Sequence, residues 1–201
     1  ILPRLPILMQ FAAEHIGSNY AGFASDHRIL VEANERCARD FGFDQLSCIS
    51  DPYRETQGFG SRIEYVPDGP PHSTHPLEDT KDLSVLLKPD ALLSVRMKDR
   101  VDAARLYRER NGSEYSILGW IEGPAAEAAD LRTPINFLID VMDDEAFACD
   151  LMDRCLDVGI AFVSFATSAN AELKVSLSSD TPDAGIIIVD DTDTTEDVLL
   201  L

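Results

Sequence analysis

The stretches Asp44–Pro52 (DQLSCISDP) and Ser116–Pro124 (SILGWIEGP) decide the fold, because each is a short apolar run that ends in an acidic residue, followed by proline in the first and by glycine and proline in the second. An apolar run of this length between polar turns predicts a strand that is buried on both faces. Proline lacks a backbone donor and ends regular structure. The two stretches therefore predict strands that end at Asp51 and Glu122.

Helical patterns lie between these strands. Apolar residues recur at three- and four-residue spacing over 26–41, with Asp26 as the expected N-cap and Gly42 as the expected stop. Alternating strands and helices predict βα units with a parallel sheet, so the expected fold class is α/β in one domain over residues 1–201. The remaining expectations are helices over 97–110, 125–131, 136–142 and 144–165, strands over 5–10 and 185–189, and a hairpin or excursion loop over 58–76.

Polar residues at the strand ends are the candidates for a functional site, because the carboxyl ends of parallel strands surround one shared pocket. Asp51 and Glu122 are the predicted catalytic residues, since an acid directly after a buried run needs solvent or a partner. Simpler roles stay open at each position, namely helix capping for acids, surface ion pairing for arginines and core packing for tryptophan. No residue is assigned to a metal, and the predicted substrate-binding residues are Gln10, Arg54, Trp120 and Arg132.

Composition excludes some classes of partner. The chain has 36 acidic and 17 basic residues and a net charge of −19, which repels nucleic acid and anionic membrane surfaces. Its four cysteines show no C-x-x-C spacing, as expected for reduced thiols in the cytoplasm. No run approaches ~18 apolar residues and the start does not resemble a signal peptide. The absence of an initiator methionine suggests that the natural N-terminus lies upstream.

Several segments together resemble the uroporphyrinogen decarboxylase superfamily, which includes uroporphyrinogen decarboxylases and corrinoid-dependent methyltransferases. The resemblance implies a TIM (β/α)8 barrel, of which this chain would supply the N-terminal part, with 163–201 diverging from the family pattern. A complete barrel typically needs ~250 residues, so the barrel is expected to be incomplete here. The matching segments, in the family's order, are Leu5–Gln10, Phe41–Glu55 (FGFDQLSCISDPYRE), Gly119–Pro124 (GWIEGP), Ala128–Arg132 (AADLR) and Phe137–Glu145 (FLIDVMDDE).

The resemblance also implies roles and a choice of reaction. Asp51 matches the decarboxylase aspartate that contacts the pyrrole nitrogens and stabilises developing positive charge. The decarboxylases bind the acidic groups of their substrate with an arginine-rich RQAGRY stretch, where this chain has Met9–His15 (MQFAAEH) and no arginine. The methyltransferase branch needs no such arginines, but its zinc-binding His-x-Cys motif is absent from these 201 residues.

The expected function is therefore corrinoid-dependent methyl transfer to a thiol. The alternatives are uroporphyrinogen decarboxylation in porphyrin biosynthesis, and a non-catalytic truncated barrel or binding module. Zinc and a corrinoid are the cofactors that the resemblance implies. The expected partners are a small-molecule tetrapyrrole or corrinoid, a corrinoid protein, and a second copy of the chain in a homodimer, because an open half-barrel exposes strand edges and an apolar face.

Overall fold

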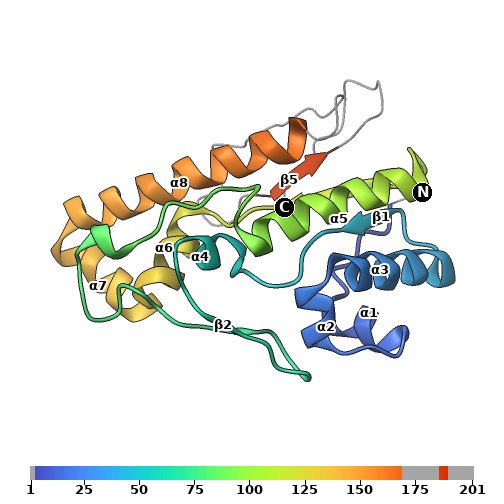
Figure 1. Cartoon of the computed structure of the whole chain (residues 1–201), viewed down its shortest axis with the longest axis horizontal. Coiled ribbons are helices and arrows are strands. Elements are labelled where there is room, and N and C mark those ends of the chain that lie inside the picture. The colour runs from blue at the N-terminus through green and yellow to red at the C-terminus, as the bar shows by residue number, and fades with distance from the viewer. Residues whose placement is uncertain (1–2, 169–185, 190–201) are drawn as a thin grey trace.

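The computed structural model describes residues 3–168 and 186–189, as a mixed α/β arrangement in which helices predominate. Figure 1 shows the two longest helices, α8 and α5, following one another along the long axis of the molecule, with α1 to α3 below α5 at one end and α6 and α7 below α8 at the other. The elements in chain order are α1 (Met9–His15), α2 (Tyr20–Ser25), α3 (His27–Phe41), β1 (Gln45–Ser47), α4 (Arg54–Gly58), β2 (Ile63–Glu64), β3 (His72–Ser73), the 3-10 turn η1 (Leu83–Val85), α5 (Val95–Asn111), β4 (Ser116–Trp120), α6 (Pro124–Arg132), α7 (Pro134–Asp143), α8 (Glu145–Ser168) and β5 (Ile186–Val189).

Strands β1 and β4 form the parallel part of the sheet, in which β4 is the central strand. They pair in parallel, with Gln45 opposite Ser116 and Ser47 opposite Leu118. A parallel pair needs a crossover connection, and α5 supplies its helix. The two predicted strands and their parallel pairing are therefore confirmed, although β1 is shorter than expected and ends four residues before Asp51.

The last strand corrects the expectation of a wholly parallel sheet. β5 pairs antiparallel with β4, with Leu118 opposite Ile188, in the order β1-β4-β5. A β-branched run predicts a strand but not its direction, because parallel and antiparallel ladders satisfy the same backbone groups. Within the described residues this sheet does not close into a barrel.

Helix α3 begins and ends as its sequence predicts. The Asp26 side chain accepts a hydrogen bond of 2.9 Å from the Arg28 backbone N–H at the N-terminus. Gly42 ends the helix at φ 66°, in the left-handed region that glycine enters without a steric penalty. The other predicted helices are confirmed as α5, α6, α7 and α8, and the predicted hairpin is the antiparallel pair β2 and β3.

The expected first strand over Leu5–Gln10 is wrong. Residues 3–8 form no regular element, and α1 begins at Met9. Pro3 and Pro6 lack the N–H groups that a central strand needs, whereas Met9–His15 is composed mostly of residues that favour helix. The segment is held instead by Asp44, whose side chain accepts a hydrogen bond from the Arg4 N–H and whose N–H donates to the Arg4 carbonyl.

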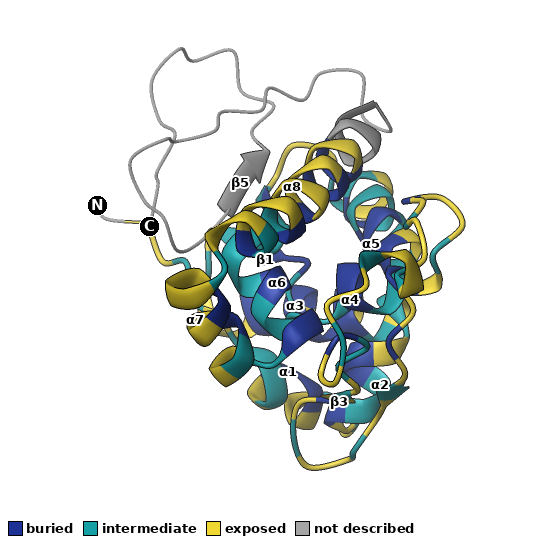
Figure 2. Ribbon diagram, turned by 90° about the vertical axis from the view of Figure 1, so that its left-hand side faces the viewer, coloured by how far each residue is buried: buried dark blue, intermediate teal, exposed yellow. Residues whose placement is uncertain are grey.

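Two hydrophobic clusters meet at α5. Ala103 and Tyr107 belong to the first cluster, with α1, α2, α3 and β1. Met97 and Val101 belong to the second, with α6, α7 and α8. Because α5 is buried on two sides, it joins the two ends of the molecule, and Figure 2 shows the buried residues of the surrounding helices turned toward the interior.

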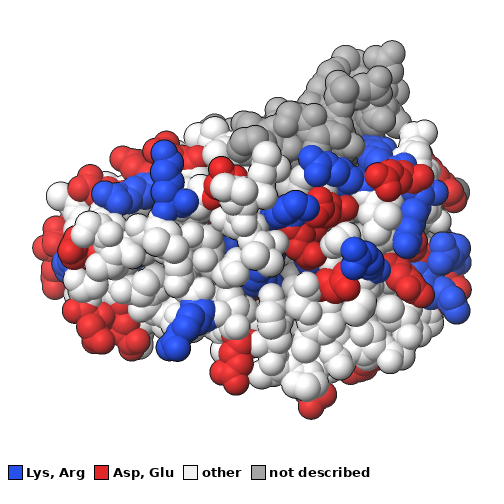
Figure 3. Space-filling model, viewed as in Figure 1, with Lys and Arg blue, Asp and Glu red and all other residues white. Residues whose placement is uncertain are grey.

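Helix α7 leaves an apolar stripe on the surface. Ile135, Leu138, Ile139 and Met142 follow helical spacing and are exposed, with Met142 at 82%. In the described part of the chain, no helix is both long enough and apolar enough to cross a membrane. On the face in Figure 3, acidic and basic side chains of the described residues are interspersed and form no continuous basic stripe there.

Leu131 and Leu138 provide a matched test of the core. Leu131 of α6 is fully buried, whereas Leu138 of α7 is 65% exposed. We expect Leu131→Ala to lower the free energy of unfolding by about 2–5 kcal/mol, because it opens a cavity in the second cluster. Leu138→Ala should change it by less than about 0.5 kcal/mol. Urea denaturation followed by circular dichroism measures both, and equal losses would contradict this assignment of the core.

Candidate active site

The ends of β1 and β4 bring two polar segments together. The residues after β1 lead to Asp51 and into α4, and the residues after β4 lead to Glu122 and into α6. Because the strands are parallel, both segments leave the same edge of the sheet. The Glu122 backbone N–H donates a hydrogen bond of 3.1 Å to Glu55 Oε1, which joins the two segments directly.

Asp51 is enclosed by an ion pair with Arg96. Arg96 Nη1 donates to Asp51 Oδ1 at 2.7 Å and Nη2 donates to Oδ2 at 2.5 Å, in a bidentate arrangement. Ser50 Oγ donates to Oδ2 at 2.7 Å, and the Tyr53 N–H donates to Oδ1 at 3.0 Å. Burial alone would raise the pKa of Asp51, but the hydrogen bonds and charge of Arg96 outweigh it and hold that pKa at about 2.

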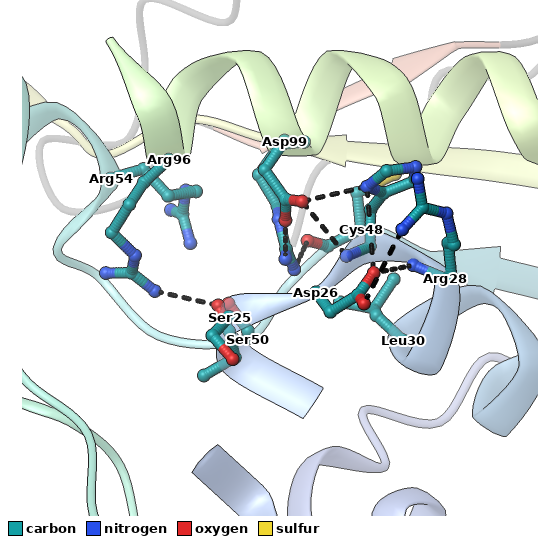
Figure 4. Close-up of polar contacts among 12 residues, drawn as sticks. Ser25, Asp26, Arg28, Leu30, Cys48, Ser50, Arg54, Arg96 and Asp99 are labelled. Carbon is teal, nitrogen blue, oxygen red and sulfur yellow. Dashed lines mark hydrogen bonds and ion pairs between the residues drawn. The ribbon is translucent and has the colours of Figure 1, made fainter. Parts of the chain in front are cut away.

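Arg96 belongs to α5 and reaches across the molecule. Its Nη2 also donates to the Ala24 carbonyl at 3.2 Å, and its guanidinium lies 5.4 Å from the centre of the Tyr65 ring. Figure 4 shows Arg96 and Asp99 extending from α5 toward the segments that carry Ser50 and Asp26. The pair therefore connects α5 to α2 and to the segment after β1.

A second group of charges lies beside the first. Arg54 has an exposed fraction of 0%, and its Nε and Nη2 lie 3.7 Å from Glu55 Oε2 and 3.6 Å from Glu122 Oε2. Arg54 also donates to the Asp51 backbone carbonyl. We call the carboxyl groups of Glu55, Glu122, Glu127 and Asp130 the acid cluster, because Glu55 and Glu122 flank Arg54 and the other two interact electrostatically with Glu55.

Several buried atoms of this group have no hydrogen-bond partner among the described residues. They include Arg54 Nε and Nη2, Glu55 Oε2 and both carboxyl oxygens of Glu127. Buried polar groups are normally hydrogen-bonded, and exceptions concentrate where proteins bind or transform something. The acid cluster is thus a candidate for chemistry, whereas the Asp51 carboxylate is already satisfied.

The acid cluster retains protons that isolated carboxyl groups would lose. Desolvation and the neighbouring Glu55 and Asp130 raise the pKa of Glu122 to about 7, although Arg54 opposes them. Desolvation together with Glu55 and Asp51 raises the pKa of Asp130 to about 6, against the opposing charge of His75. Burial raises the pKa of both Glu55 and Glu127, and the Glu55 carboxylate further raises the pKa of Glu127 and of Glu122. A group that titrates near neutral pH is suited to general acid and base catalysis.

The predicted site residues separate into two sets. Asp51, Arg54 and Glu122 lie together, and the side chain of Glu122 keeps an exposed fraction of 18%. Trp120 ends β4 next to them and is half-buried, where its side chain helps to lower the pKa of Glu122. The other two do not contact this group in any interaction that the structure shows.

Gln10 and Arg132 are occupied elsewhere. Gln10 lies in the first turn of α1, where its Nε2 donates to Glu14 Oε1 at 2.7 Å. Arg132 is buried at the end of α6, where it bonds Asp140 of α7 at 2.7 Å and the carbonyls of Leu77 and Glu78. Their proposed part in substrate binding stays a prediction.

Four residues of the site escape the strand-end argument, namely Glu55, Arg96, Glu127 and Asp130. A signal for two of them is present in the helical spacing. Arg96 and Arg100 continue the buried stripe of Ala103 and Tyr107 on α5, and Glu127 shares the buried face of α6 with Leu131. A charged residue on an otherwise buried stripe indicates a buried ion pair or a functional group. Glu55 follows Arg54 directly and carries no comparable pattern.

The described residues do not fit a zinc–thiolate site. One group of three potential ligands lies close enough to share an ion, and it consists of Asp26, His27 and Asp99, without a thiol. His27 Nδ1 is already 2.9 Å from Asp99 Oδ1. Burial raises the pKa of the Cys48 thiol to about 12 and also raises that of Cys155, so both are held in the neutral form that binds metal poorly.

Comparison with known proteins agrees with the early resemblance. Among solved structures 22 chains match, and one of them, a methyltransferase from Methanosarcina mazei, has 17% sequence identity and a TM-score of 0.74. The match covers 84% of this chain and 51% of the methyltransferase, so the chain spans about half the length of that structure. At this identity the likeness concerns the fold alone. No curated protein sequence matches. The model of the family described as uroporphyrinogen decarboxylase (URO-D) matches residues 2–179, and the chain therefore belongs to the uroporphyrinogen decarboxylase family.

Proposed function

We propose that this chain is part of an enzyme that transfers a methyl group from a corrinoid to a thiol. The family includes decarboxylases and methyltransferases, which supports an enzyme of one of these two kinds. The observation that favours methyl transfer is that acidic side chains are more accessible than basic ones at the strand ends. Glu122 is partly exposed and Asp130 is half-buried, whereas Arg54 and Arg96 are buried.

Accessible acidic side chains and buried basic ones disfavour the binding of a polyanionic substrate. A porphyrinogen carries acidic side chains, which need accessible cations for binding. The segment where the decarboxylases carry arginines is α1 here, and Met9–His15 contains none. Repulsion from the partly exposed carboxylates adds to this lack of cations. Binding of a thiol and a methyl-corrinoid does not require a set of accessible cations among the described residues.

The similarity to the Methanosarcina mazei methyltransferase supports the same choice at the level of fold. We propose that the chain forms the N-terminal part of a TIM barrel. In its site, the ion pair between Asp51 and Arg96 would hold the surrounding segments in place, and Glu122 would be the reactive carboxyl group. The small-molecule partner would be a corrinoid or related tetrapyrrole, delivered by a corrinoid protein. No step through zinc is assigned to these residues, because their cysteines and histidines do not form the site that a zinc-bound thiolate requires.

The test of methyl transfer uses the full-length protein that contains this chain. It is incubated with methylcobalamin and a thiol, and mass spectrometry measures the methyl thioether. We expect product with wild-type protein and at least about a hundredfold less with Glu122→Gln, as is typical for loss of a positioned acid or base. The exposed Glu109 of α5 provides the control variant Glu109→Gln, which should retain wild-type activity. Absence of turnover with every thiol tried would reject the proposal.

Decarboxylation of uroporphyrinogen is the second candidate, and the match of Asp51 to the decarboxylase aspartate favours it. It predicts that coproporphyrinogen production is abolished by Asp51→Asn. Unchanged production in that variant would reject the proposed role of Asp51. Because Asp51 also holds Arg96, the folded state of the variant must be verified before loss of activity is interpreted.

The stability of Asp51→Asn is itself predictable. We expect the substitution to lower the free energy of unfolding by about 3–5 kcal/mol, because it leaves Arg96 buried without its counter-charge. The folded pKa of about 2 lies below the ordinary value of 3.8, so the contribution of the pair is present above pH 3.8 and is lost as the pH falls toward 2. Asp102→Asn in the surface pair with Lys98 is the control and should cost at most about 1 kcal/mol. Urea titrations at neutral and acidic pH measure both variants, and equal losses would contradict the buried role of Asp51.

A further inference from the structure

The acid cluster holds more negative charge than its cation can balance. Asp51 is neutralised separately by Arg96, so Arg54 is the nearest positive charge for Glu55 and Glu122. Arg54 approaches the two carboxylates through different nitrogen atoms at similar distances, 3.7 and 3.6 Å. One guanidinium is thereby shared between a fully buried carboxyl group and a partly exposed one.

Glu127 makes the imbalance larger. It is fully buried, and neither of its carboxyl oxygens accepts a hydrogen bond from a described residue. An ionised carboxylate in such a position costs several kcal/mol, and a protein avoids that cost by keeping the group protonated. Glu55 Oε2 is also without a hydrogen-bond partner, so the unsatisfied acceptors lie on two adjacent elements, α4 and α6.

We propose that Glu55, Glu122 and Glu127 bind protons as one unit, in which Glu55 and Glu122 share Arg54 as their counter-charge and Glu127 is a further buried carboxyl group, and that Glu122 exchanges these protons with the substrate. When Glu55 is ionised it competes with Glu122 for Arg54 and favours the protonated form of Glu122. When Glu55 is protonated, Arg54 is left to Glu122 and favours its ionised form. The charged and titratable groups that face this unit from the surrounding elements are Arg54 of α4, the preceding Tyr53, Asp130 of α6, Cys155 of α8, Asp51 and its partner Arg96, and His75 beside Asp130.

The unit supplies the proton acceptor that methyl transfer to a thiol needs, and this use rests on the proposed function. In the transfer, the S–H bond of the thiol breaks and an S–CH3 bond forms. The cobalt–carbon bond of the methyl donor breaks, and its electron pair stays on cobalt. The released proton passes to the Glu122 carboxylate, which balances the reaction without a further reactant. Proton binding by the unit itself does not depend on this reaction.

Titration of the glutamate carboxyl carbons by 13C NMR tests the unit in the intact chain. In the wild type, Glu122 should titrate near pH 7, and Glu55 and Glu127 should titrate above the ordinary glutamate value of 4.5. Glu55→Gln should lower the midpoint of Glu122 by on the order of one pH unit, because a like charge is removed. Glu109→Gln should leave that midpoint unchanged. Midpoints of all three groups near 4.5, or a Glu122 midpoint that ignores Glu55→Gln, would overturn the proposal.

Glu127→Gln provides a second measurement that stays informative if Glu55→Gln does not fold. The folded pKa of Glu127 is raised, so wild-type stability should decrease as the pH rises from its ordinary value of 4.5 through the folded one. Glutamine copies the neutral acid, and the variant should lose less stability than wild type between pH 5 and pH 8 in urea unfolding. An identical pH dependence in both proteins contradicts protonation of Glu127.

The two proposals fail in different ways. If no thiol is methylated but the titrations behave as described, methyl transfer is rejected and the proton-binding unit stands. If methyl transfer occurs and Glu122→Gln leaves the pH profile of kcat/KM unchanged, the role of Glu122 in proton exchange is rejected. Ordinary titration together with active methyl transfer rejects the unit alone.

Discussion

The ion pair between Arg96 and Asp51 is the interaction on which the arrangement of this protein depends. Both side chains are buried, and breaking such a pair leaves an uncompensated charge in the interior. Arg96 stands near the start of α5, the helix that is shared by the two hydrophobic clusters, and Asp51 follows β1. The pair therefore fixes where the end of β1 lies relative to α5. Since α4 begins three residues after Asp51, the same contact places Arg54 and Glu55.

The acid cluster is positioned by this ion pair, but its carboxyl groups differ from Asp51 in proton affinity. Both carboxyl oxygens of Asp51 accept hydrogen bonds and its pKa is lowered, whereas both carboxyl oxygens of Glu127 lack a hydrogen-bond partner among the described residues and burial raises its pKa. The two carboxyl groups thus differ in proton affinity in opposite directions, which is how proteins divide structural and reactive roles among identical groups. Glu122 lies between these extremes, because it touches Arg54 and also keeps some contact with solvent.

The sequence predicted the elements whose signals are local. Helix α3 was predictable because Asp26 and Gly42 define its ends, and β1 and β4 were predictable from apolar runs closed by an acid and a proline. The prediction of a strand over Leu5–Gln10 was wrong, because the apolar composition of the segment is typical of a strand but Pro6 cannot donate a backbone hydrogen bond to a neighbouring strand. The direction of β5 was not predictable, since pairing direction depends on the path of the chain rather than on the strand residues. At the site, the positions of Asp51, Arg54 and Glu122 are predictable because they follow the ends of strands. Arg96 and Glu127 are not predictable in this way, because charged residues of a helix usually lie on its exposed face.

Burial of Arg54 and Arg96 has a consequence for how the protein responds to dissolved salt. Counter-ions weaken attraction between charges that face water, as in the surface pair of Lys98 and Asp102, but they reach enclosed charges far less. The acidity of the enclosed carboxyl groups of Asp51, Glu55 and Glu127 should therefore change little with ionic strength, whereas that of the partly exposed Glu122 should respond more. Dissolved salt thus reaches this site mainly through the solvent-facing carboxylate next to Arg54.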